Sequence, residues 1–206
     1  MSTDGFDFAF AFILRLEGGL VDNPNDPGGR TNRGVTQRVY TAWRTSMGLD
    51  TQDVALIDDS EVRTIYWSGY WQQSHCNSLV QLLDLLQLDT AINMGIASAI
   101  CLLQAAAGCT IDGRFGPETE RAVGSKDYQQ LIREYCGYRE QRYYEIVAAK
   151  PNLGTFLQGW LNRLQIVRHE IGIVAVEVFG ATDPAIWGPS AKTPDYQQGL
   201  SFSQEN

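Results

Sequence analysis

Two carboxyl groups and two hydroxyl groups near the start of the chain are residue types that could carry out hydrolysis. In the stretch LEGGLVDNPNDPGGRTNRGVT, Glu17 and Asp26 are nine residues apart, and Thr31 and Thr36 lie on either side of Gly34. A protonated carboxyl group and an ionised one can divide the acid and base roles of glycoside hydrolysis. Either threonine hydroxyl could help to hold the attacking water. The residue types therefore suggest Glu17 as the acid and Asp26 as the ionised partner.

The segment before this stretch is predicted to place Glu17 at the end of a helix. Apolar residues recur at helical spacing up to the Gly18-Gly19 pair, which should end the helix. Glu17 continues this apolar line, so we expect its carboxyl group to be partly buried at the negative end of the helix dipole. Both effects favour the protonated form and raise a carboxyl pKa. The predicted core-facing residues are Phe6, Phe10, Ile13 and Leu14.

The polar residues that follow have an alternative interpretation. Residues 19–35 are dense in turn formers and lack a helical period, so we expect a loop with a short hairpin. A glutamate before two glycines can be an ordinary exposed residue, and an aspartate before Pro-Gly can be an ordinary turn residue. The residue types alone leave the catalytic and the structural interpretation equally open.

The rest of the chain is predicted to be mainly helical. Asp58 and Glu61 have the spacing of a capping box, and Pro117 suits the first turn of a short helix. Four-residue spacing pairs Tyr66 with Tyr70 in the segment IYWSGYW. Helices are expected at 36–47, 59–74, 79–94, 97–107, 126–149 and 153–178.

Two residues of these helices are candidate sugar contacts. Tyr70 could stack on a pyranose face, although aromatic residues at helical spacing more often pack in a core. Asn93 lies at the helix break in DTAINMG, where it could bind an N-acetyl group or cap a turn. Together with Thr36, these residues make up the predicted substrate-binding set.

Composition excludes several other functions. The net charge of −8 argues against a nucleic-acid partner, which clustered Lys and Arg would attract. The four cysteines lack ligand spacing, so we expect free thiols and neither a metal nor a cofactor. Asp4 and Asp7 stand where a secretory signal would be positively charged, and no apolar run is long enough to span a membrane. We expect a monomer made in the cytoplasm.

The stretch EGGLVDNPNDPGGRTNRGVT resembles the signature of glycoside hydrolase family 108. This family comprises lysozyme-like muramidases of phage endolysins and of bacterial cell-wall and toxin-release systems. The resemblance implies a lysozyme-like helical fold and makes Glu17 the catalytic glutamate. The order of Glu17, Asp26 and Thr31 also looks like the Glu/Asp/Thr arrangement of phage-type lysozymes, where one more residue separates Asp from Thr. The segments IYWSGYW and DTAINMG resemble the family's aromatic helix and its substrate-side segment.

The later segment AICLLQAAAGCTIDGRFGPETERAV looks like the helical peptidoglycan-binding module that often follows this catalytic unit. We therefore expect a catalytic part at 1–95, a peptidoglycan-binding-like part at 96–180 and an irregular tail at 181–206. The expected activity is hydrolysis of the β-1,4 bond between N-acetylmuramic acid and N-acetylglucosamine, on a wall reached through a holin-type pore or another route. Two alternatives remain: a noncatalytic wall-binding or secretion-assisting protein, and a glycosidase acting on chitin or chitosan.

Overall fold

The computed structural model describes residues 4–21 and 30–179. Over these ranges the chain is mainly helical with one small sheet, which confirms the predicted fold class. The chain divides into two compact units after Arg139. The division at residues 95 and 180 stays a prediction, and the predicted tail 181–206 lies outside the described residues.

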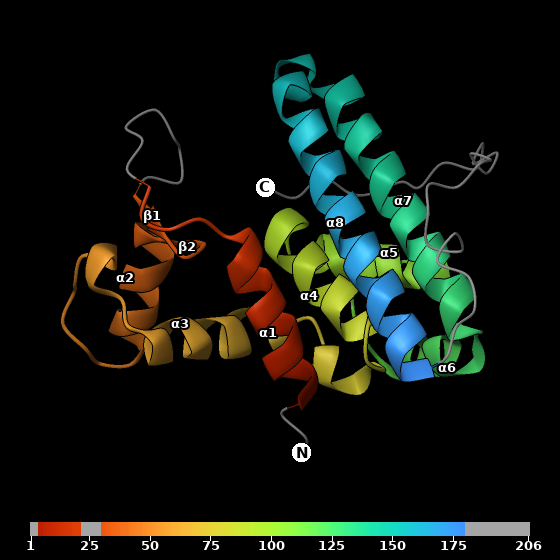
Figure 1. The fold of residues 1–206 in the computed structure, drawn as a ribbon, viewed down its shortest axis with the longest axis horizontal. Helices are drawn as coiled ribbons and strands as arrows, with labels where there is room; N and C mark the ends of the chain where they lie inside the picture. The colour runs from red at the N-terminus through yellow and green to blue at the C-terminus, as the bar shows by residue number, and fades with distance from the viewer. Residues whose placement is uncertain (1–3, 22–29, 180–206) are drawn as a thin grey trace. The chain divides into compact units, whose positions relative to one another are not determined.

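Helix α1 (Asp4–Leu16) carries the apolar stripe expected from the sequence. The helix packs against α4 within the first unit (Figure 1). Arg15 lies in its last turn, where a positive charge interacts favourably with the helix dipole. The backbone N–H of Glu17 still donates to the Ile13 carbonyl at 3.0 Å, so helical bonding reaches Glu17. The buried side chains of α1 are Phe6, Ala9, Phe10, Phe12 and Ile13.

A β-hairpin with a two-residue turn follows, as predicted. Strands β1 (Thr31–Asn32) and β2 (Val35–Thr36) are antiparallel, with Thr31 opposite Thr36. The turn residues Arg33 and Gly34 have φ angles of 51° and 76°. Positive φ at both positions is what a type I′ turn requires, and this turn matches the twist of the strands that it joins.

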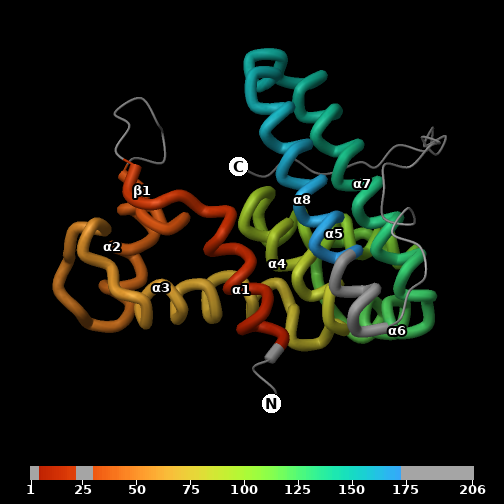
Figure 2. The backbone as a smooth tube through the Cα atoms, in the orientation of Figure 1, coloured from red at the N-terminus to blue at the C-terminus, as the bar shows by residue number. Residues whose placement is uncertain are grey.

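Helix α2 (Gln37–Ser46) begins directly after the hairpin, and the short 3₁₀ helix η1 (Val54–Leu56) packs against β1. The Gln37 side chain joins these elements, because its oxygen accepts from the Val54 N–H at 2.7 Å. Asn32 of β1 donates to the Val54 carbonyl at 3.1 Å. The hairpin is thereby fixed to the elements that follow it (Figure 2).

Helix α3 (Asp59–Tyr66) begins with the predicted capping box. The Asp58 carboxylate accepts from the backbone N–H of Glu61, and the Glu61 side chain accepts from the N–H of Asp58. The helix continues as a π-turn, η2 (Trp67–Trp71), in which the N–H of Gln72 donates to the Trp67 carbonyl at 3.0 Å.

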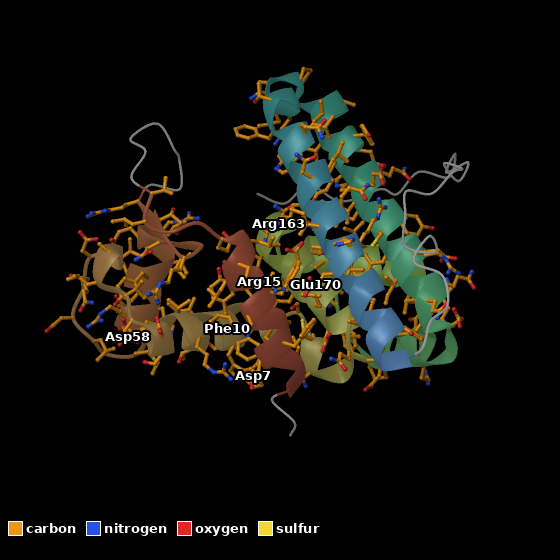
Figure 3. All side chains as sticks on the ribbon, in the orientation of Figure 1. Asp7, Phe10, Arg15, Asp58, Arg163 and Glu170 are labelled. Atoms are coloured by element: carbon orange, nitrogen blue, oxygen red, sulfur yellow. The ribbon has the colours of Figure 1, made fainter. Side chains whose placement is uncertain are left out.

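Aromatic side chains hold α3 and its π-turn against α1. Phe6 meets Trp67 and Trp71 edge to face, with ring centroids 4.9 and 5.3 Å apart. Phe10, labelled in Figure 3, lies 5.5 Å from the Tyr66 ring. An ion pair of 2.5 Å between Asp7 of α1 and Arg63 of α3 adds a surface contact.

Helix α4 (Leu83–Met94) is the central helix of the first unit, with every residue from Leu83 to Ala91 buried. A start near residue 79 was predicted, and this prediction was wrong. Residues 76–78 form a short 3₁₀ helix (η3), and Leu82 has a φ of +78° that interrupts helical geometry. Helix α4 therefore begins at Leu83, and the Asp84 carboxylate accepts from the N–H groups of Leu82 and Leu85 at this helix start.

Three further helices complete the first unit. Helices α5 (Ile96–Ala107) and α6 (Pro117–Ser125) follow, and the unit ends within α7 (Tyr128–Ala149). Gly95, with a φ of +90°, separates α4 from α5 at the predicted break. Arg139 of α7 reaches Asp89 of α4 at 2.7 Å, and neither side chain is exposed to solvent.

The second unit is a helical hairpin. It contains the end of α7, the short 3₁₀ helix η4 (Pro151–Leu153) and α8 (Gly154–Phe179). Tyr143 and Trp160 stack with ring centroids 5.4 Å apart, and Arg168 pairs with Glu140 at 2.9 Å. In the part of the chain that the structure describes, every helix is too short or too polar to cross a bilayer.

Candidate active site

Glu17 lies at the point where α1 gives way to the hairpin. Its backbone completes the last helical hydrogen bond, and its side chain is half-buried. Gly18, Gly19 and Leu20 are exposed, and Val21 then pairs with Thr31 through N–O distances of 2.8 and 2.9 Å. The segment after Glu17 is therefore bound to the same hairpin that the Glu17 carboxyl group approaches.

The hairpin turn approaches the Glu17 carboxyl group at Gly34. A Cβ atom at Gly34 would come within 3.0 Å of the Glu17 carboxyl group and of the Tyr66 hydroxyl oxygen. Gly34 also has a φ of +76°, which other residues adopt at a cost. Glycine is thus required here for two reasons, the turn conformation and the close approach.

Two tyrosines from α3 and η2 lie near the same carboxyl group. Tyr66 is buried, and its hydroxyl donates to the Arg33 carbonyl at 3.0 Å. Tyr70 is half-buried, and its ring centroid is 5.7 Å from that of Tyr66. Burial raises the pKa of the Tyr70 phenol, and the Glu17 charge raises it further. Tyr70 is consequently a hydrogen-bond donor at neutral pH.

The two threonines have different roles in the hairpin. Thr31 is central, because its backbone pairs with Val21 on one side and it stands opposite Thr36 on the other. The Thr36 hydroxyl caps α2 by accepting from the Val39 N–H at 3.3 Å. The catalytic role of Thr31 and the substrate-binding role of Thr36 stay predictions.

The structure does not bring together all the predicted site residues. Asp26 lies outside the described residues. Asn93 is half-buried in the last turn of α4, the helix that packs against α1. Tyr70, by contrast, lies near enough to Glu17 for the carboxylate charge to raise the pKa of its phenol.

Sequence reasoning missed two residues of this site, Gly34 and Tyr66. Gly34 was noticed only as the residue between two threonines, although Arg-Gly between short β-forming segments is a turn signal. Tyr66 was noticed only as the partner of Tyr70 at four-residue spacing. That spacing predicts a shared helix face, but it does not say that this face meets Glu17.

Among the described residues there is no cluster of three His, Cys, Asp or Glu side chains suited to a metal ion. All four cysteines are free thiols, with Cys76 and Cys136 buried and Cys101 and Cys109 partly exposed. The arrangement consists of one carboxyl group, two phenols and a turn of backbone, which suits proton transfer to a substrate oxygen.

Comparison with known proteins gives two family matches along the chain. The sequence profile described as "Glycosyl hydrolase 108" matches residues 10–95, which include Glu17, Gly34, Tyr66 and Tyr70. The profile described as "Predicted Peptidoglycan domain" matches residues 98–165. No curated protein sequence matches the chain.

A solved structure extends the similarity over most of the chain. The SagA protein of Brucella abortus is 31% identical in sequence and superposes with a TM-score of 0.71. The match covers 82% of this chain and 95% of SagA. The similarity is therefore one of sequence and of fold.

Proposed function

The chain belongs to glycosyl hydrolase family 108, and we propose that it is a peptidoglycan hydrolase that cleaves the β-1,4 bond between N-acetylmuramic acid and N-acetylglucosamine. The observation that carries this proposal is the half-buried Glu17 carboxyl group, which ends α1 and faces the Gly34 turn. The family and the peptidoglycan profile at 98–165 support the same polymer as substrate and ligand.

In the proposed reaction Glu17 is the general acid. Its carboxyl proton passes to the glycosidic oxygen as the bond between that oxygen and the anomeric carbon breaks. A water molecule attacks the anomeric carbon from the opposite face and gives its proton to the Asp26 carboxylate. Thr31 helps to orient this water. The outcome is inversion, which requires the two carboxyl groups to be about 6.5–9.5 Å apart.

The remaining predicted residues act on the sugar. The Tyr70 phenol, protonated at neutral pH, donates to the bound saccharide beside the reacting bond. Asn93 binds an N-acetyl group, and Thr36 contacts the substrate from the hairpin. A pore or another release route gives the enzyme access to the wall.

Digestion of purified sacculi tests the activity. The new reducing ends should all be N-acetylmuramic acid, as identified by borohydride reduction and mass spectrometry. N-acetylglucosamine at the reducing end would mean that the other glycosidic bond is cut. Sacculi that are bound but never cut would favour a noncatalytic wall-binding protein, and faster cleavage of chitosan would favour a chitosan-directed glycosidase.

A further inference from the structure

The Tyr66 hydroxyl is buried at the contact between α3 and the hairpin turn. Its ring packs on Phe10 of α1 and on Tyr70 of η2, and its exposed fraction is 1%. The hydroxyl donates to the carbonyl of Arg33, the first turn residue. A second contact joins the same elements, since the Arg33 guanidinium pairs with Asp59 at the start of α3. Tyr66 is thus the buried link between α3 and the turn.

The same hydroxyl and the Glu17 carboxyl group approach one side of Gly34. Both lie within 3.0 Å of the position that a Cβ atom of Gly34 would occupy. The turn backbone at Gly34 therefore lies directly against Glu17, and the hydrogen bond to Arg33 holds it there. Displacement of the turn would change the surroundings of the carboxyl group.

A phenol has one hydrogen, and the Tyr66 hydroxyl donates it to the Arg33 carbonyl. This bond joins residues 33 positions apart in the sequence, so it holds the turn against α3. A general acid transfers its proton only when it is held within reach of the substrate oxygen.

We propose that Tyr66 is a positioning residue for Glu17: its hydroxyl holds the Arg33-Gly34 turn against the carboxyl group. This inference rests on the proposed function, because it takes Glu17 as the general acid. Tyr66 itself does not touch the reacting bond.

The charged and titratable groups of the neighbouring elements are mostly paired. Arg33 of the turn is bound to Asp59, and Asp89 of α4 is bound to Arg139. On α1, the Arg15 guanidinium lies over the Phe12 ring, 5.4 Å from its centroid. Asp84 of α4 contacts the opposite end of α1, at Gly5. Tyr70 is a further titratable neighbour among the described residues, and its phenol stays protonated at neutral pH.

The variant Tyr66→Phe removes the hydroxyl and keeps the ring. We expect kcat on peptidoglycan fragments to fall about tenfold with KM within about twofold, as for the loss of one hydrogen bond that acts on the reacting group.

Tyr40→Phe is the matched control. Tyr40 is also fully buried, and its hydroxyl donates to Glu61 at 2.6 Å in the contact between α2 and α3. This variant should lose thermal stability while it keeps the kcat of the wild type. An unchanged kcat in Tyr66→Phe would overturn the proposal, as would the same kcat loss in both variants.

A measurement on the wild-type protein does not depend on how the variants fold. The Tyr66 hydroxyl proton should exchange slowly with water and show a nuclear Overhauser effect to the Gly34 Hα protons. Rapid exchange without that effect would also overturn the proposal. Failure of the proposed function would give a different result. The wild-type protein would then release no reducing ends, while the contact between Tyr66 and the Arg33-Gly34 turn would still be observed.

Discussion

Two carboxyl groups lie near opposite ends of α1 and differ in their surroundings: Glu17, which follows the helix, and Asp84, which reaches it from α4. Glu17 follows the last residue of the helix and is half-buried against the Gly34 turn. Asp84 lies against the first turn of α1, where one of its oxygens would be 2.6 Å from a Cβ atom at Gly5. Burial raises the pKa of Asp84 to about 7, although its other oxygen accepts from two backbone N–H groups.

The raised pKa of Asp84 predicts a loss of stability with rising pH. The unfolded chain releases this proton near pH 4, whereas the folded protein keeps it to about pH 7. The folded state binds more protons between these values, so the free energy of unfolding should fall as pH rises through this window. The contribution is on the order of 4 kcal/mol.

The variant Asp84→Asn keeps the acceptor oxygen for the two N–H groups and removes the titration. Urea unfolding between pH 4 and pH 7 should show a smaller decrease of stability in this variant than in the wild type. Asp50→Asn, at an exposed position, should leave the wild-type slope unchanged. Equal slopes in Asp84→Asn and the wild type would show that Asp84 is not the group responsible.

Glu17 could be found from the sequence because its type, its helix end and the signature around it all agree. Asp84 could not be found in this way, because its burial depends on Gly5, which is 79 residues away in a different helix. Tyr66 was missed for the same reason. Its partner Arg33 lies 33 residues earlier, and local spacing does not report such contacts.

At the scale of elements, local signals predicted helix ends where the capping groups are adjacent in sequence. The capping box of Asp58 and Glu61 and the first-turn Pro117 both occur as expected. The start of α4 was predicted wrongly, because apolar residues continue before it while Leu82 takes a positive φ. The π-turn at Trp67–Trp71 could not be predicted either. The four-residue spacing of Tyr66 with Tyr70 and of Trp67 with Trp71 also fits an ordinary α-helix.

The contact between α4 and α7 depends on a fully buried ion pair. Arg139 bonds to Asp89 at 2.7 Å and to the Thr90 hydroxyl at 3.1 Å. Replacing Arg139 by Met leaves the Asp89 charge buried without its partner. The free energy of unfolding should fall by about 3–5 kcal/mol, as measured by urea denaturation.

Two further variants separate the charge from the packing. Arg142→Met removes a partly exposed pair with Glu145 on the same helix and should cost less than about 1 kcal/mol. In the double variant Asp89→Leu with Arg139→Met, apolar groups replace both charges and much of the loss should be recovered. An Arg139→Met variant as stable as Arg142→Met would rule out a structural role for the pair.

At the scale of the whole molecule, the charge of −8 opposes binding to a wall that carries carboxylate groups on its peptide stems. The Debye length shortens from about 30 Å at 0.01 M salt to about 8 Å at 0.15 M salt. We therefore expect the rate on intact sacculi to rise severalfold over this range, mainly through a lower KM. A rate that falls steadily with added salt would indicate a local basic surface that dominates the net charge.

The arrangement of helices followed from family resemblance more than from periodicity. Helical spacing predicted α1 and its buried face, but α4 has no single apolar face, so its spacing does not select a partner. The continuous burial from Leu83 to Ala91 shows why, because other elements surround this helix. Local patterns did not predict how the helices pack together. The lysozyme-like fold was predicted from the resemblance of the Glu17 signature to glycoside hydrolase family 108.

The central claim is that Glu17 donates the proton that breaks the glycosidic bond. Glu17→Gln keeps the size of the side chain and removes its acid, and Glu120→Gln makes the same change at an exposed position of α6. Both variants should unfold near the wild-type temperature. Release of reducing ends from purified sacculi should fall about 10²–10⁴-fold in Glu17→Gln and stay normal in Glu120→Gln. A folded Glu17→Gln variant that releases reducing ends at a near-normal rate would contradict the account.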